Sequence, residues 1–158
     1  MKIVISSGQE APLVASLLAQ KNIPVIFGPV QALPRREDVS HAAPLEAAGQ
    51  LVKAGVKVAF ATGDGNNARM LPYHAAMAVA WGLPRDEAIK AMTINAAEIL
   101  GVADRIGSID TGKHANLLVV KGDPLDIRSE VTHVIIAGRD VDLENKHHAL
   151  YERYRARR

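Results

Sequence analysis

Three short runs of mainly apolar residues mark the first sixty positions of the chain. They cover Lys2 to Ser6, Ile23 to Phe27 and Val56 to Ala61. Continuous runs of this kind are typical of parallel strands that are covered on both faces. The segments between them have the apolar spacing of helices, one starting near Gln9 and ended by Asn22, the other spanning Pro44 to Ala54. The pattern therefore predicts a βαβαβ arrangement with a parallel sheet.

Three further helical segments follow the third predicted strand. The spacing predicts helices from Pro72 to Trp81 and from about Pro84 to Met92. Asn95 and Glu98 then stand three residues apart, as a helix cap and its partner do, and Gly101 is placed to end that helix. Residues 28–43, in contrast, are rich in glycine, proline and charge, which indicates a long surface loop.

The periodicity changes after Gly112. The residues from Asn116 to Lys121, from Val131 to Ala137 and onward from Asp140 have the character of antiparallel strands, with a tight turn at Gly138 and Arg139. These strands belong to a second sheet. We expect three parts: residues 1–108 with the parallel strands, 109–145 with the second sheet, and a basic tail at 146–158.

Composition narrows the function classes. The chain has 158 residues, 48% of them hydrophobic, so it can bury a core, and it has no cysteine, which excludes disulfides and thiolate chemistry. The net charge of +2 is concentrated in the tail, at Lys146, Arg153, Arg155, Arg157 and Arg158, and no basic stripe suited to nucleic acid is evident. No segment is apolar enough for a signal peptide or membrane span, so we expect a cytoplasmic protein with no membrane partner.

Several sequence blocks together resemble the C-terminal portion of the amidohydrolase superfamily, in particular its imidazolonepropionase-like and Xaa-Pro dipeptidase-like branch. The blocks are GVKVAFATGD, LPYHAAMAVAWGL, TINAAEILG, RIGSIDTGKHANLLVV and VTHVIIAGRDV. The resemblance implies an α/β fold that is part of a TIM (β/α)8 barrel, with the three parallel strands as barrel strands 6 to 8. The later strands would belong to the small composite sandwich domain of such enzymes.

The same resemblance implies a function. It predicts the C-terminal fragment of a metal-dependent hydrolase that acts on the C–N bonds of small cyclic amides or dipeptide-like molecules. Such enzymes use a His-x-His pair, which this sequence lacks. We therefore expect a divalent metal, zinc by preference, in the complete enzyme. The chain alone is expected neither to hold zinc tightly nor to be active. The expected partner is a complementing N-terminal barrel half or a second copy.

Asp64 is the candidate catalytic residue and metal ligand, because the resemblance places it at the end of barrel strand 8. A carboxylate there can contact both a metal ion and the attacking water. Asn66, Asn67 and Arg69 follow on the same loop and are candidate substrate contacts. Without the resemblance, Asp64-Gly65 is an ordinary turn pair, the two asparagines favour turn conformations and Arg69 is a surface charge.

The sequence also departs from the family pattern. Thr62-Gly63-Asp64 replaces the usual Thr-Asp or Ser-Asp, Ser6 to Gln9 offers no histidine, and Asn116 stands where an aspartate is usual. A local three-ligand metal site formed by His41, Asp64 and His74 is one alternative. Against it, His41 lies in the long loop, and a solvated polar residue is expected at His74, in the first turn of its helix. A second alternative is that the chain is a non-catalytic assembly module, because three parallel strands without further partners leave an open edge.

Overall fold

Two three-stranded sheets organise the chain. The computed structural model describes residues 3–34 and 36–155. In the first sheet, the strands β1 (Ile5–Ser6), β2 (Val25–Phe27) and β3 (Val58–Phe60) run parallel in the order β1-β2-β3. The predicted parallel order is confirmed, although each strand is shorter than its apolar run. Lys2, the first residue of the predicted first strand, lies outside the described residues, as do Arg35, Arg157 and Arg158.

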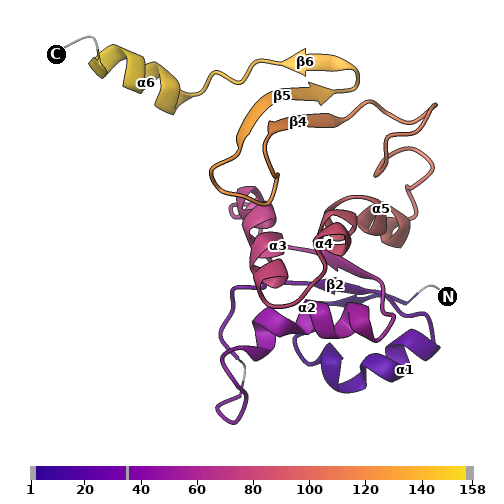
Figure 1. Ribbon diagram of the computed structural model, residues 1–158. Helices are drawn as coiled ribbons and strands as arrows, with labels where there is room; N and C mark the ends of the chain where they lie inside the picture. Colours follow the sequence, from indigo (N-terminus) through magenta and orange to yellow (C-terminus); the bar gives the residue numbers. More distant parts are fainter. Residues whose placement is uncertain (1–2, 35, 156–158) are drawn as a thin grey trace.

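Helices follow each parallel strand. They are the 3-10 helix η1 (Ala11–Val14), α1 (Ala15–Gln20), α2 (Ala43–Lys53), the 3-10 helix η2 (Ala68–Met70), α3 (Leu71–Ala80), α4 (Arg85–Met92) and α5 (Ile94–Leu100). Figure 1 shows α1 and α2 along one side of the parallel strands, and α3, α4 and α5 between these strands and the second sheet. None of the helices in the described part of the chain could cross a membrane.

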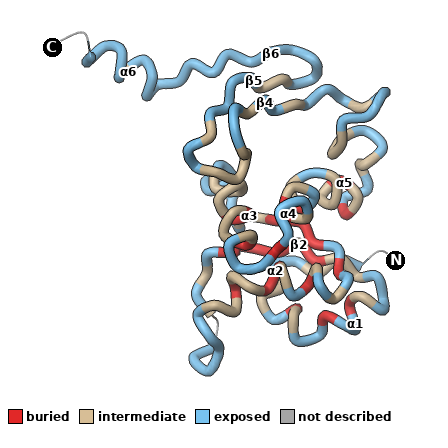
Figure 2. Tube along the Cα trace, viewed as in Figure 1, coloured by how far each residue is buried: buried red, intermediate tan, exposed pale blue. Residues whose placement is uncertain are grey.

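The hydrophobic core lies between the parallel strands and their helices (Figure 2). Its largest fully buried side chains are Phe27, Leu51, Val25, Val30 and Val58. They come from β2, β3, α2 and the start of the loop after β2, and alanines of α2, α3 and α4 let these elements approach closely. The continuous apolar runs therefore mark the buried strands, as expected for a parallel sheet.

The predicted cap of α5 is wrong. The helix begins at Ile94, so Asn95 lies inside its first turn, and its Nδ2 donates a hydrogen bond to the backbone oxygen of Val58 at 3.0 Å. Glu98 forms an ion pair with Lys57 instead of reaching back to a cap. Gly101 does end the helix, with a left-handed φ of 73°. The two side chains that the local pattern assigned to capping therefore make tertiary contacts, one with β3 and one with the residue before it.

The second sheet contains β4 (Leu117–Lys121), β5 (Glu130–Ile136) and β6 (Arg139–Val141) in antiparallel order. Its β5–β6 turn lies at Ala137 and Gly138, both with positive φ, so Arg139 already belongs to β6. Asn116 bonds this turn, because its Oδ1 accepts the N–H of Ala137 at 2.8 Å. After the sheet, α6 (Lys146–Arg155) projects away from the rest of the chain (Figure 1).

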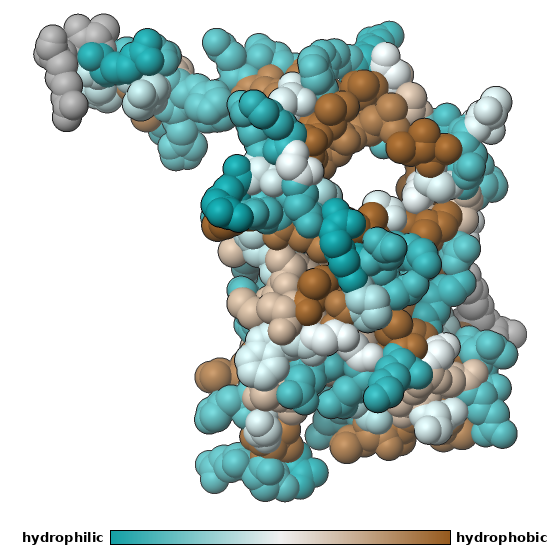
Figure 3. Space-filling view, viewed as in Figure 1, coloured by the Kyte–Doolittle hydropathy of each residue, from teal (hydrophilic) through white to brown (hydrophobic). Residues whose placement is uncertain are grey.

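One face of the second sheet is aliphatic. Leu118 lies opposite Val134, which in turn lies opposite Val141, so the three side chains share that face. Leu118 is 56% exposed and Val141 39% exposed. Figure 3 shows hydrophobic surface along the rim of an opening between this sheet and the helices. The described residues therefore leave this face largely uncovered.

Candidate functional site

The carboxyl ends of the three parallel strands meet at one edge of the first sheet. There, the segment after β2 touches the segment after β3 at two points. A methyl group added to Gly28 would lie 1.8 Å from the backbone oxygen of Ala61, and one added to Gly63 would lie 3.5 Å from Cδ of Pro29. Only a glycine at position 28 permits this approach. The two loops therefore form one continuous rim.

Asp64 lies on this rim, four residues beyond the last residue of β3. Its Oδ1 accepts the backbone N–H of Asn67 at 2.9 Å, and its Oδ2 accepts the side-chain Nδ2 of Asn67 at 2.9 Å. The hydroxyl of Thr62 donates to the backbone oxygen of Asp64 at 3.0 Å. Asn67 thus holds the carboxylate of Asp64, and Thr62 holds its backbone.

Hydrogen bonding keeps this carboxylate ionised. The backbone and side-chain donors of Asn67 are the main causes that lower the pKa of Asp64 below its ordinary value of 3.8. Both donors are neutral, so the negative charge is stabilised without being cancelled. Because Asp64 is exposed, its carboxylate is open to water and to a cation.

The other predicted site residues share the loop with Asp64, and all are exposed. Asn67 is hydrogen-bonded to Asp64. The Asp-x-x-Asn spacing, which is common in turns, could have predicted this contact. Asn66 has its side chain at the surface, and Arg69, in η2, makes no ion pair with any described residue. Substrate binding by these three residues stays a prediction.

The alternative metal site of His41, Asp64 and His74 is wrong. Within residues 3–34 and 36–155, no group of three or more histidine, aspartate or glutamate side chains is arranged to hold a metal ion. His41 is exposed on the long loop, whereas His74 is buried in α3, where the sequence suggested a solvated position. The ring of His74 is taken up by a different contact, since its Nδ1 accepts the backbone N–H of Gln31 at 3.4 Å.

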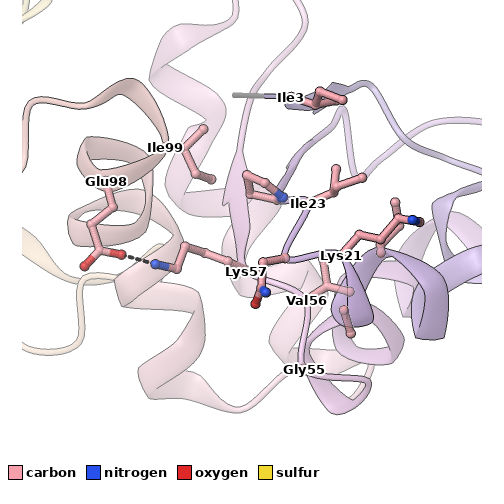
Figure 4. A pocket seen from close by; sticks show the side chains of 12 residues that line it. Ile3, Lys21, Ile23, Gly55, Val56, Lys57, Glu98 and Ile99 are labelled. Atoms are coloured by element: carbon pink, nitrogen blue, oxygen red, sulfur yellow. Dashed lines mark hydrogen bonds and ion pairs between the residues drawn. The ribbon is translucent and has the colours of Figure 1, made fainter. Parts of the chain in front are cut away.

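A cavity of about 750 Å³ opens at the opposite end of the sheet (Figure 4). Its walls include Ile23 and Val56, which precede their strands, and Lys57, whose ammonium points toward the carboxylate of Glu98. Active sites of parallel α/β folds lie at the carboxyl ends of the strands. This cavity is therefore at the wrong end to serve Asp64, and the rim remains the candidate site.

By its fold, the chain is a parallel α/β protein with an acidic residue at the carboxyl edge of its sheet. Residues 3–141 match the Amidohydrolase family, and the chain belongs to that family. It is similar to the imidazolonepropionase of Flavobacterium johnsoniae, with 35% identity over 82 residues, covering 49% of this chain and 20% of that protein.

Solved structures show the same fold. An amidohydrolase from Thermotoga maritima MSB8 superposes with a TM-score of 0.78 at 36% identity, covering 88% of this chain and 36% of that one. A Xaa-Pro dipeptidase with bound methionine superposes with a TM-score of 0.68 at 24% identity, covering 89% and 40% of the two chains. The chain thus spans about two fifths or less of the length of these relatives.

Amidohydrolases are generally metal-dependent. A structurally similar adenosine deaminase from Xanthomonas campestris carries zinc. It superposes with a TM-score of 0.62 at 23% identity, covering 98% of this chain and 42% of that one. The described residues of this chain do not fit such a metal by themselves, because they contain no group of three or more histidine, aspartate or glutamate side chains placed to hold a metal ion. A zinc site needs three protein ligands or more.

Proposed function

We propose that the chain forms part of a hydrolase active site that cleaves C–N bonds, with the Asp64 carboxylate as its proton acceptor. The observation that carries this proposal is an exposed carboxylate, held by two hydrogen bonds from Asn67, at the carboxyl edge of a parallel sheet in a member of the amidohydrolase family. In such a role, Asp64 takes a proton from the attacking water while the water oxygen bonds to the amide carbon. It then returns this proton to the nitrogen as the C–N bond breaks. Asn67 holds the carboxylate in one orientation during this transfer.

The proposed fold of the complete protein is a (β/α)8 barrel in which β1, β2 and β3 are strands 6 to 8. Residues 1–108 would then belong to the barrel, 109–145 to a composite sandwich and 146–158 to a basic tail. Two observations support this arrangement. Within the described residues β1 has no partner on its outer side, and the aliphatic face of the second sheet is largely uncovered.

Cyclic amides or dipeptide-like molecules are the proposed substrates, in line with the imidazolonepropionase and Xaa-Pro dipeptidase among the similar proteins. Arg69 has no intramolecular ion pair among the described residues, so its guanidinium is free to pair with a substrate carboxylate. The side-chain amide of Asn66 can pair with the scissile group. Both extend from the same loop as Asp64.

The metal of the complete enzyme is proposed to depend on ligands outside this chain. The isolated chain is then expected to bind no stoichiometric zinc and to hydrolyse neither cyclic amides nor Xaa-Pro dipeptides. Co-expression with the complementing N-terminal half would restore both properties. The test is metal analysis and amide hydrolysis for the chain alone and with that half, using Asp64→Asn as the variant and Asp104→Asn, another exposed aspartate, as the matched control.

The second candidate is an assembly module without catalysis. It is favoured by the open edge of β1 and the aliphatic face formed by Leu118, Val134 and Val141. Such surfaces associate with a second chain. Sedimentation would show a concentration-dependent dimer that Leu118→Lys weakens. A compact monomer at high concentration would exclude this function.

A further inference from the structure

His74 is the one buried polar side chain that the structure records for residues 3–34 and 36–155, with 6% of its surface exposed. It comes from the first half of α3, the helix that follows the Asp64 loop. A buried polar group is normally retained for a hydrogen bond that it makes. The bond of His74 runs to the other side of the rim.

That bond joins Nδ1 of His74 to the backbone N–H of Gln31 at 3.4 Å, across 43 positions of the sequence. Since the N–H is the donor, Nδ1 must be the acceptor, so the ring is neutral with its proton on Nε2. Burial favours the same state, because desolvation lowers the pKa of His74 below its ordinary value of 6.5. The bond is long, and no other hydrogen bond from Gln31 to α3 accompanies it.

Gln31 is linked in turn to the Asp64 segment. It follows Pro29 by two residues, and the ring of Pro29 lies beside Gly63, the neighbour of Asp64, close enough that a methyl group added to Gly63 would lie 3.5 Å from its Cδ. One residue earlier, Gly28 lies in direct contact with Ala61. A shift of the loop at Gln31 would therefore be transmitted through Pro29 to the backbone that carries Asp64.

We propose that His74 is a positioning residue, which holds the 28–31 loop against the 61–64 segment and so sets the place of the Asp64 carboxylate. The importance of this contact for catalysis rests on the proposed function, whereas the contact itself does not. His74 acts through Gln31 and Pro29, and it binds neither metal nor substrate. This role explains why a histidine is buried in an otherwise apolar helix face.

Two variants separate the acceptor from the bulk of the ring. In His74→Asn, the side-chain oxygen takes the place of Nδ1 and keeps an acceptor for Gln31. In His74→Leu, the volume remains and the acceptor is lost. Amide exchange at Gln31, and the NMR signals of Gly63 and Asp64, are measured on the full chain, with Val134 of the second sheet as an internal control.

His74→Leu is expected to speed exchange at Gln31 about fivefold or more and to move the signals of Gly63 and Asp64. His74→Asn is expected to keep the exchange rate of Gln31 and the signals of Gly63 and Asp64 near those of the parent chain. Neither variant should change the exchange rate or the signal of Val134. The proposal is overturned if His74→Leu leaves Gln31, Gly63 and Asp64 unchanged, or if the two variants perturb them equally.

The imidazole nitrogens of the parent chain provide a measurement that requires no variant. Their ¹⁵N shifts are expected to report a proton on Nε2 with Nδ1 unprotonated, and a proton on Nδ1 at neutral pH would contradict the proposal even if His74→Leu failed to fold. None of these readouts depends on turnover. If the chain stays inactive after co-expression with the complementing half while the His74 contact is intact, the proposed function alone is refuted.

Discussion

Asn67 binds both carboxylate oxygens of Asp64, one through its backbone N–H and the other through its side-chain amide, each at 2.9 Å. The two residues are three positions apart, so the loop closes on itself through this pair. Because a single residue supplies both donors, the orientation of the carboxylate is tied to the conformation of one short turn. Neutral donors also leave the full negative charge on the carboxylate.

Replacing Asn67 tests this pair directly. Asn67→Ala removes the side-chain donor, and we expect the pKa of Asp64 to rise toward its ordinary value because a bond to the charged form is lost. The measurement is a ¹³C NMR titration of the Asp64 carboxyl group. The matched control is Asn66→Ala, which leaves both bonds in place. Equal pKa values in the parent chain and Asn67→Ala would refute the role of Asn67.

The contact between the two rim loops predicts a contrast between two glycines. In Gly28→Ala the added methyl group would overlap the backbone oxygen of Ala61, and φ at this position is +148°, so we expect a loss of more than about 1 kcal/mol. Gly65→Ala places its methyl group in open space and is expected to change the free energy of unfolding by less than about 0.5 kcal/mol. Urea denaturation of both variants measures these losses, and an equal loss in the two would contradict the described contact.

The buried ring of His74 predicts a pH dependence of stability. Its pKa is lowered in the folded chain and close to 6.5 when unfolded. As the pH falls from about 6.5 toward the folded value, the unfolded chain gains a proton that the folded chain does not, so the free energy of unfolding decreases across that window. Urea denaturation between about pH 5 and 7.5 measures this. His74→Leu should remove this part of the slope, and an unchanged slope would show that His74 is not its source.

The described core predicts that a buried and an exposed leucine contribute differently to the free energy of unfolding. Leu51 of α2 is fully buried, so Leu51→Ala is expected to lower the free energy of unfolding by about 2–5 kcal/mol. Leu33 is 80% exposed, and Leu33→Ala should change it by less than about 0.5 kcal/mol. Thermal and urea unfolding provide the measurement. Similar losses in the two variants would contradict the described core.

The sequence predicted the local features of the fold well. The strand around Val25, the helix stop at Gly101 and the second sheet all follow from periodicity and turn chemistry, which act over a few residues. Pro84, expected at the first helical position, lies instead at the cap of α4, one position before its first helical residue, Arg85. The family relationship was also recognisable, because its blocks recur in a fixed order.

Contacts between distant positions could not be predicted in the same way. Asn95 and Glu98 match a capping pattern, yet in the structure they contact Val58, the first residue of β3, and Lys57, which precedes it. His74 suggests a solvated position until the loop residue Gln31 folds over it. The sequence indicated a turn at Asp64 but not its bond to Asn67, and the close approach of Gly28 to Ala61 arises only when two strands lie side by side.

Metal content and turnover of the purified chain, measured alone and after co-expression with the complementing half of an amidohydrolase barrel, test the central claim most directly. We predict less than stoichiometric zinc and no amide hydrolysis for the chain alone, with both restored by the complementing half and turnover then lost in Asp64→Asn. Stoichiometric metal together with turnover in the isolated chain would contradict the account, since its own described side chains form no metal site.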